Sequence, residues 1–300
     1  MLMIIIGHTF NGYPVGNAAF YFPAWMNVLH MNLWGGMGVA VFLFLSGYGL
    51  FTSLERRKNI DGHYVVSKAK RLLIPFILYW TVEFFVLLVF NRQELSMHLL
   101  QEIATFSIHP DIENWFFKVI VGIYVIMLIL FRCHVSNAVR LAVVFLLSII
   151  YLFAMRELGF GQWWWNSIMC FPFGALVAYR RDLFSRIPAL YVIVATGVIL
   201  VALYAVHMNR IVLHLSFVFF CIYAIKVINI RNRILYYIGF NSFIFYFMEC
   251  PVMDEIMMFS YPIFPLYVIL TLLGTFAISY PCIEVEKRLR PVAAQTHSAH

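Results

Sequence analysis

Ten runs of apolar residues, separated by short polar segments, make up most of this chain of 300 residues. A membrane-spanning helix needs about 20 consecutive apolar residues, so runs of this kind are typical of a helical bundle in a bilayer. Only 12% of the residues are charged, against about 25% in an ordinary soluble domain. The sequence therefore predicts an all-α polytopic membrane protein with about ten transmembrane helices in a single domain, residues 1–287. The runs cover residues 1–11, 35–54, 72–90, 116–131, 139–154, 163–179, 189–206, 211–228, 234–253 and 262–283.

The basic residues predict how the bundle is oriented. If the ten runs alternate across the membrane, all but four of the 21 Lys and Arg residues fall on the side of the amino terminus; the exceptions are Arg92, Lys118, Arg156 and Arg210. Cytoplasmic loops are rich in Lys and Arg. Both termini are therefore expected in the cytoplasm, with residues 288–300 as a disordered tail. The net charge of +7 records this orientation and does not indicate nucleic-acid binding.

The first run is about half as long as a span requires. Only MLMIIIGHTF precedes the polar stretch from Asn11, and it has neither the basic segment nor the cleavage site of a signal peptide. We therefore expect a truncated first helix, which would arise from a misplaced start codon or in a shortened relative.

No permanently bound cofactor or metal is expected. The cysteines are scattered singly, without C-x-x-C or His pairing at metal-ligand spacing, and are interpreted as packing residues. No nucleotide or flavin motif is present. The five positions are Cys133, Cys170, Cys221, Cys250 and Cys282.

Five ionisable residues lie within or beside the apolar runs: His8, Glu83, His207, His214 and Glu249. Each costs about 2.5–3.5 kcal/mol at membrane depth, so each invites a functional hypothesis. His8, in IIIGHTF, has the chemistry of a general base near neutral pH. The structural alternative is a histidine hydrogen-bonded between helices. His207 and His214 lie seven residues apart and share a helical face, but two histidines alone make no metal site.

Two further segments allow both a structural and a functional interpretation. The small residues of GGMGVAVFLFLSGYGLF permit close helix packing, or Ser46 and Gly47 form a polar notch beside His8. In KAKRLLIPF, the cations Lys68, Lys70 and Arg71 suit anionic lipid and topology, or the phosphates of an acyl-CoA, with Pro75 fixing the start of the next helix.

The loop 91–115 carries acidic residues before Trp115. A carboxylate and an indole on the outer side could hold a sugar. A tryptophan at this position is also typical of the aromatic belt at a membrane interface.

Six sequence elements in order resemble the acyltransferase 3 family of membrane acyltransferases. They are GVAVFLFLSGYGLF, KRLLIPF, NWFFKVIVGIY, CFPFGALVA, IGFNSFIFYF and PCIEVEKRL. The family's proposed catalytic histidine in the first helix corresponds to His8. An arginine that the family often places eleven residues earlier would fall before Met1, and the family's later histidine corresponds to Glu249.

The resemblance implies an enzyme of a cell envelope, in the bacterial cytoplasmic membrane. It would move an acyl group, commonly acetyl, from acyl-CoA to a hydroxyl of an envelope or secreted glycan. His8 would be the general base, and Lys68, Lys70 and Arg71 would bind the donor. The residues expected to line the site are Ser46, Gly47, Glu83, Trp115, Tyr124, Ser242, Tyr246 and Glu284.

Two alternatives remain open from the sequence. A transporter or flippase of lipid-linked sugars also has many spans and buried ionisable residues, although the two halves of this chain show no paired repeat. An inactive, truncated relative is the other. The sequence predicts neither the acceptor, the acyl chain nor the oligomeric state.

Overall fold

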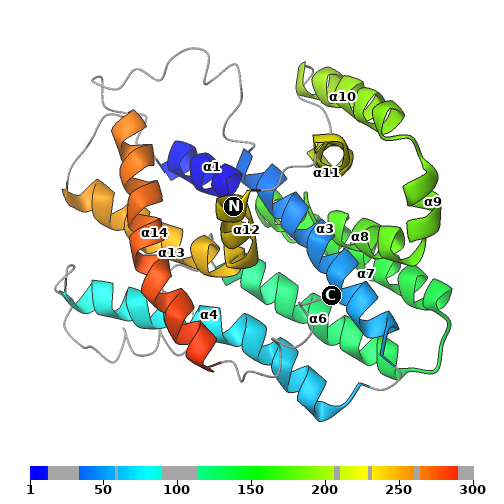
Figure 1. Cartoon of the computed structure of the whole chain (residues 1–300), viewed down its shortest axis with the longest axis horizontal. Coiled ribbons are helices and arrows are strands. Elements are labelled where there is room, and N and C mark those ends of the chain that lie inside the picture. The colour runs from blue at the N-terminus through cyan, green and yellow to red at the C-terminus, as the bar shows by residue number, and fades with distance from the viewer. Residues whose placement is uncertain are drawn as a thin grey trace.

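The computed structural model describes residues 1–12, 34–57, 60–89, 114–205, 210–228, 232–259 and 264–289, and every regular element in these ranges is a helix (Figure 1). The helices are α1 (Leu2–Gly12), α3 (Trp34–Glu55), α4 (Gly62–Val89), α6 (Asn114–Arg132), α7 (Asn137–Glu157), η2 (Gln162–Trp164), α8 (Cys170–Tyr179), α9 (Arg181–Arg186), α10 (Ala189–Ala205), α11 (Arg210–Ile228), α12 (Arg233–Phe240), α13 (Ser242–Phe259) and α14 (Phe264–Leu289).

The all-helical fold class is confirmed over the described residues, and five of their helices are long and apolar enough to cross a membrane. These are Trp34–Glu55, Trp115–Arg132, Asn137–Glu157, Arg210–Ile228 and Leu266–Leu289. Helices α8, α10 and α13 contain shorter apolar segments. The chain is therefore an integral membrane protein, and the count of ten spans stays a prediction. The last helix continues through Leu289, two residues into the predicted tail, and residues 290–300 lie outside the described ranges.

Helix α4 begins earlier than the sequence indicated. Pro75 was expected to fix its start, but Pro75 lies inside the helix, which begins at Gly62. Asp61 explains the difference because its carboxylate accepts a hydrogen bond from the backbone N–H of Tyr64, at 2.8 Å, in the manner of an N-cap. The basic residues Lys68, Lys70 and Arg71 therefore lie within α4, and their helical positions decide which of them share a face.

Two predicted spans are interrupted. Run 234–253 divides at Asn241 into α12 and α13, where the Asn241 amide donates to the carbonyl of Tyr237, at 2.9 Å. Asn side chains compete with helical backbone hydrogen bonds in this way. Run 163–179 contains the short η2 and a turn before α8 begins at Cys170.

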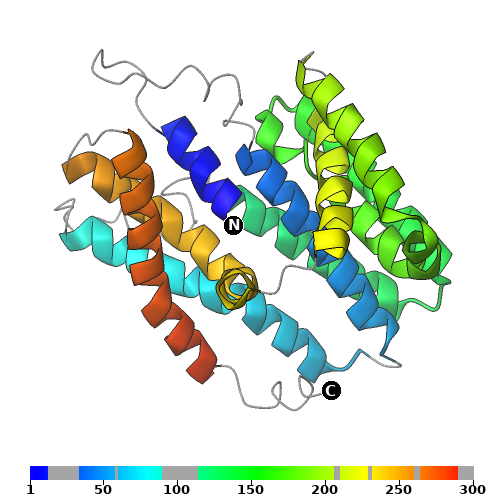
Figure 2. The same ribbon diagram turned by 45° about the horizontal axis from the view of Figure 1, so that its top comes forward.

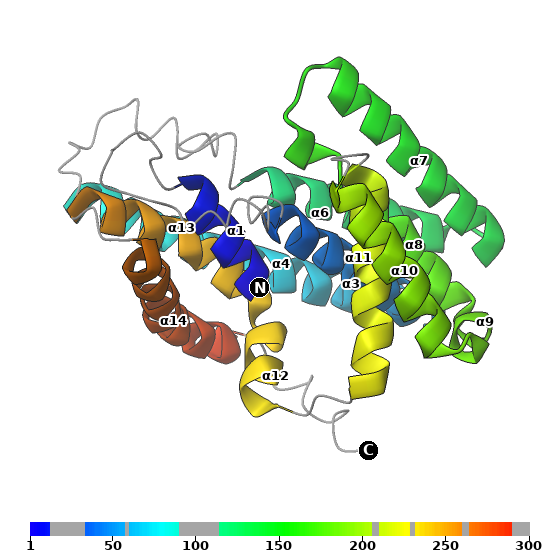
Figure 3. The same ribbon diagram turned by 90° about the horizontal axis from the view of Figure 1, so that it is seen from above.

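Helix α3 is the central element of the bundle. It packs against α1, α6, α8 and α11, and Figure 3 shows α12, α13 and α14 on one side of it and α7 to α11 on the other. Helices α10 and α11 lie side by side at the edge of the molecule (Figure 2).

A reciprocal glycine contact joins α3 to α8. A methyl group on Gly47 would lie 2.1 Å from the carbonyl oxygen of Phe171, and one on Gly174 would lie 2.0 Å from that of Phe44. Real Cβ atoms do not approach so closely, so both positions need glycine. Small residues allow such backbone contact between membrane helices.

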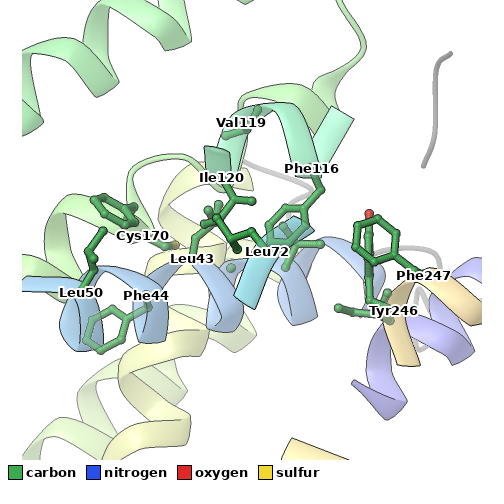
Figure 4. Packing of buried hydrophobic residues seen from close by; sticks show 14 of the residues in the cluster. Leu43, Phe44, Leu50, Leu72, Phe116, Val119, Ile120, Cys170, Tyr246 and Phe247 are labelled. Carbon is green, nitrogen blue, oxygen red and sulfur yellow. The ribbon is translucent and has the colours of Figure 1, made fainter. Parts of the chain in front are cut away.

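One hydrophobic cluster fills the interior from α3 to α13. Figure 4 shows part of it, with Leu43 and Phe44 of α3, Phe116 and Ile120 of α6, and Phe247 of α13. Phe247 packs against Phe76 of α4 at 5.6 Å and against Tyr79 of the same helix at 5.3 Å between ring centroids. This packing holds α4 and α13 together beside the amino-terminal helix.

Candidate active site

Contact between two glycines brings α1 against α3. A methyl group on Gly7 would lie 2.3 Å from the backbone nitrogen of Gly35, and one on Gly38 would lie 2.4 Å from the side chain of Ile4. Residues 4 and 7 of α1 thus meet residues 38 and 35 of α3, so the two helices run antiparallel. His8, the neighbour of Gly7, consequently lies at the Trp34 end of α3.

His8 forms a hydrogen bond with a carboxylate from the other end of the chain. Its Nδ1 atom bonds to Oε1 of Glu249 on α13. The Glu249 side chain is 0% exposed, whereas that of His8 is 21% exposed. The buried carboxylate therefore holds one nitrogen of an imidazole whose ring is still partly accessible.

The other edge of the imidazole faces α3. A methyl group on Gly35 would lie 3.4 Å from Cδ2 and 3.7 Å from Nε2 of His8. The ring of Tyr246, one turn before Glu249 on α13, is 6.3 Å from the His8 ring between centroids. Of the residues expected to line the site, the structure thus brings Tyr246 to His8.

An aromatic wall extends from Tyr246 to Trp115 and Trp164. Tyr246 lies 5.2 Å from Phe116, Phe116 lies 5.8 Å from Trp115, and Trp115 lies 5.9 Å from Trp164, all between ring centroids. Trp115 is 6% exposed, which leaves little of its indole face for a sugar. We interpret its role as packing.

The basic residues gather at the far end of α3. Tyr64, Lys68 and Arg71 are spaced by four and three residues on α4 and so share one helical face. The cations of Arg57 and Lys68 lie 4.3 Å and 5.2 Å from the centroid of the Tyr64 ring. We call Arg57, Lys68 and Arg71 the basic cluster. Lys70 is exposed and lies off this face.

Burial and the other two members of the basic cluster change the acidity of Lys68, which lies before the apolar part of α4. Burial, reinforced by the positive charges of Arg71 and Arg57, lowers the pKa of Lys68 to about 8. An anionic ligand would offset the repulsion between Lys68 and the two neighbouring cations, and would thereby stabilise the charged form of this partly buried lysine. Tyr124 of α6 interacts electrostatically with Arg71 and Tyr64, so this predicted site residue belongs with the cluster.

The basic cluster and His8 lie near opposite ends of α3. Ser53, whose hydroxyl hydrogen bonds to that of Tyr64 at 2.9 Å, is the α3 residue at the cluster. It is eighteen residues from Gly35 beside His8, or about 27 Å along the helix axis. A molecule that touches both must be long.

Among the remaining predicted residues, Ser46 and Gly47 lie toward the other end of α3 from His8. Gly47 lies twelve residues beyond Gly35 on α3 and packs on α8, so it and Ser46 form no notch beside the histidine. Glu284 forms an ion pair with Lys287 at 2.6 Å near the end of α14. Glu83 is buried on α4, and Ser242 opens α13 one turn before Tyr246.

A second buried histidine contacts the neighbouring glycine of α3. The Nδ1 atom of His214 on α11 is 2.9 Å from the hydroxyl of Ser167, which donates a hydrogen bond of 3.2 Å to the carbonyl of Gly36. A methyl on Gly36 would lie 3.1 Å from Nε2 of His214. His8 and His214 therefore lie beside adjacent residues of α3. His207, the other member of the predicted histidine pair, lies outside the described residues.

Sequence reasoning identified Glu249 as a costly buried acid but did not pair it with His8. The two residues are 241 positions apart, and only the packing of α1 on α13 joins them. Ser167 and Gly36 were likewise missed because nothing in their local sequence indicates a partner on α11. Within the described ranges, no group of three or more His, Cys, Asp or Glu residues could hold a metal ion.

Comparison with known proteins identifies one family. Residues 1–284 match the family model described as an acyltransferase domain, that of the acyltransferase 3 family. No curated protein and no solved structure matches the chain.

Proposed function

Because the chain belongs to the acyltransferase 3 family, we propose that this membrane acyltransferase moves an acyl group, such as acetyl, from acyl-CoA to a hydroxyl of an envelope or secreted glycan. The observation that carries the proposal is the hydrogen bond between the partly accessible His8 and the buried Glu249. The acyl donor, the acceptor and the base are the parts that experiment must test.

His8 is proposed as the general base. A carboxylate only accepts hydrogen bonds, so its partner Nδ1 carries the proton and Nε2 presents the lone pair. Nε2 would take the proton of the acceptor hydroxyl as its oxygen attacks the thioester. Glu249 would hold the ring in this tautomer and stabilise the imidazolium that forms, as the third member of a catalytic triad does.

The transfer balances without a further reactant. In the direct route, the acceptor oxygen bonds to the carbonyl carbon of the thioester, and the carbon–sulfur bond then breaks. The proton held by His8 passes to the departing thiolate of CoA, which restores the neutral imidazole. General acid–base assistance of this kind contributes about 10²–10⁴-fold to a rate.

The position of the basic cluster supports a donor with a charged head and a long arm. Arg57, Lys68 and Arg71 offer donors suited to phosphates, and they lie about 27 Å, measured along α3 by helix rise, from the level of His8. Acyl-CoA carries its thioester at the end of an extended arm from its phosphates. A compact acyl donor would not contact both groups.

The deciding experiment replaces His8 by Gln and by Ala and measures the acyl content of surface glycans by mass spectrometry. We expect glycan acylation to fall by at least about 100-fold in both variants, because a general base contributes about that much to the rate. The amount of protein in the membrane should be unchanged. His134→Gln, in the exposed turn between α6 and α7, is the matched control and should acylate as the natural chain does. Undiminished acylation by either His8 variant would refute the assignment.

A further inference from the structure

A cavity of about 230 Å³ lies between α6, α7 and α8, away from the His8 pair. Its walls are mainly apolar and include Ile126 of α6, Val144 and Leu147 of α7, and Phe171 of α8. Gly122 and Leu147 are exposed, so the cavity opens at the surface. Both α6 and α7 are long and apolar enough to span a bilayer, so this opening faces lipid.

The polar groups of the cavity gather at one end. Lys118, in the second turn of α6, lines the cavity and is exposed. Helix α7 returns antiparallel to α6 after a short turn (Figure 1), which brings Tyr151 toward the same end. The Tyr151 hydroxyl lines this end, is buried and has no hydrogen-bond partner among the described residues. The cavity thus has a cation and a phenol at one end, the hydroxyl of Ser148 one turn before Tyr151, and otherwise mainly apolar walls.

Gly122 keeps this space open. Nothing lies within 4 Å of the position that a methyl group on Gly122 would occupy. This glycine differs from Gly7, Gly47 and Gly174, where another helix fills the space. Because Gly122 lines the cavity, a larger side chain at this position would occupy space at the opening of the cavity.

We propose that this cavity binds one hydrocarbon chain of an anionic glycerophospholipid, with the phosphate at Lys118 and the Tyr151 hydroxyl donating to the head group. The amphipathic order of the walls matches that of a lipid, and the ammonium complements the negative phosphate. The site is separate from the proposed catalytic pair, and it adjoins the aromatic wall through Trp164, which lines the cavity and contacts Trp115.

Because this cavity attracts a lipid only weakly, we expect it to bind an abundant membrane lipid and not a scarce lipid-linked carrier. A chain that leaves the bilayer for an apolar cavity gains little, because lipid tails are as apolar as the cavity walls. The preference then comes mainly from one exposed lysine near one phosphate, and an exposed ion pair of this kind is worth up to about five-fold in binding. Such a site is filled only by a lipid present at high concentration, as a bulk anionic phospholipid is.

The test measures retained lipid by native mass spectrometry. The full chain is reconstituted in vesicles of mixed phosphatidylethanolamine and phosphatidylglycerol and then extracted in mild detergent. We expect retained phosphatidylglycerol to be enriched over its share of the vesicle, by up to about five-fold. Lys118→Gln should retain lipid without this preference, and Gly122→Leu should retain none at this site. Gly49→Leu, at another glycine with nothing within 4 Å, is the matched control and should bind as the natural chain does.

Three results would overturn the proposal. They are equal retention of both lipids by the natural chain, undiminished retention by Gly122→Leu, and displacement of phosphatidylglycerol by an equal concentration of undecaprenyl phosphate, which would assign the cavity to a lipid-linked carrier. If Gly122→Leu does not elute as a single species on size exclusion, Gly122→Ala replaces it, with a partial loss expected. These outcomes are independent of whether His8 is the catalytic base.

Discussion

At the scale of single residues, the pairing of His8 with Glu249 determines what the imidazole can do. The carboxylate is entirely buried, and a charge there is tolerated only with a partner of this kind. A histidine whose ring is fixed by such an acid has a defined tautomer and a defined direction for its lone pair. Their hydrogen bond therefore offsets part of the cost of burying this acid, whose Oε2 atom is buried without a hydrogen-bond partner among the described residues.

Glu249→Gln tests this pairing. The amide keeps the shape of the side chain but cannot stabilise the imidazolium, so kcat should fall by at least about 100-fold while KM for acyl-CoA stays within a small factor. Steady-state kinetics of the purified enzyme separate the two constants. A variant that loses donor affinity and keeps kcat would show that Glu249 acts on structure alone.

Lys68 predicts a pH dependence of donor binding. Its pKa is lowered to about 8 by burial and by Arg71 and Arg57, so the ammonium is present below that pH and is lost as the pH rises through it. If Lys68 binds donor phosphate, KM for acyl-CoA should rise between pH 7 and pH 9, the range that brackets this pKa. Lys68→Arg, which stays charged throughout, should remove most of this rise. A rise of the same size in both proteins would contradict the assignment.

At the scale of helices, the ten apolar runs located the elements, while their ends depended on single polar side chains. Asp61 caps α4 so that the helix begins thirteen residues before Pro75, and Asn241 divides a predicted span. Each helix end depends on one local polar side chain, which the pattern of apolar residues does not reveal. The sequence predicted that α3 makes close contacts, but not which helix it contacts. The small residues of α3 indicated contact, but not that α8 would supply Gly174.

The contact between α3 and α8 predicts a sharp contrast between two glycines. Gly174→Ala places a methyl 2.0 Å from a backbone carbonyl oxygen of α3, whereas Gly49→Ala meets nothing within 4 Å. Forced overpacking costs about 1–3 kcal/mol, so the first variant should unfold earlier in a thermal denaturation series in detergent. The second should match or exceed the natural chain. Equal stability of the two variants would contradict the observed packing.

At the scale of the whole molecule, the sequence predicted the membrane setting and the catalytic candidate, but not the assembly of the site. His8 stood out because a histidine inside an apolar run is costly. Its partner, its glycine neighbour and the distance to the basic cluster all depend on contacts between helices far apart in the chain. No local pattern specifies such contacts, because each helix offers several apolar faces of similar character.

The orientation predicted from the basic residues is testable with a natural probe. Cys133 is an exposed free cysteine in the turn between α6 and α7, whereas Cys170 and Cys282 are buried. If the basic cluster faces the cytoplasm, a membrane-impermeant maleimide should label Cys133 in inverted vesicles but not in intact cells. Cys133→Ser supplies the background. Labelling in intact cells alone would reverse the assigned orientation.

The glycine contact between α3 and α8 also sets an order of events during synthesis. Gly47 meets Phe171, 124 residues later in the chain, which a ribosome reaches on the order of ten seconds afterwards. Until then, the most tightly packed surface of the central helix has no protein neighbour and must be covered by lipid or by the insertion machinery. Nascent chains stopped before α8 should therefore be recognised as incomplete by membrane quality control.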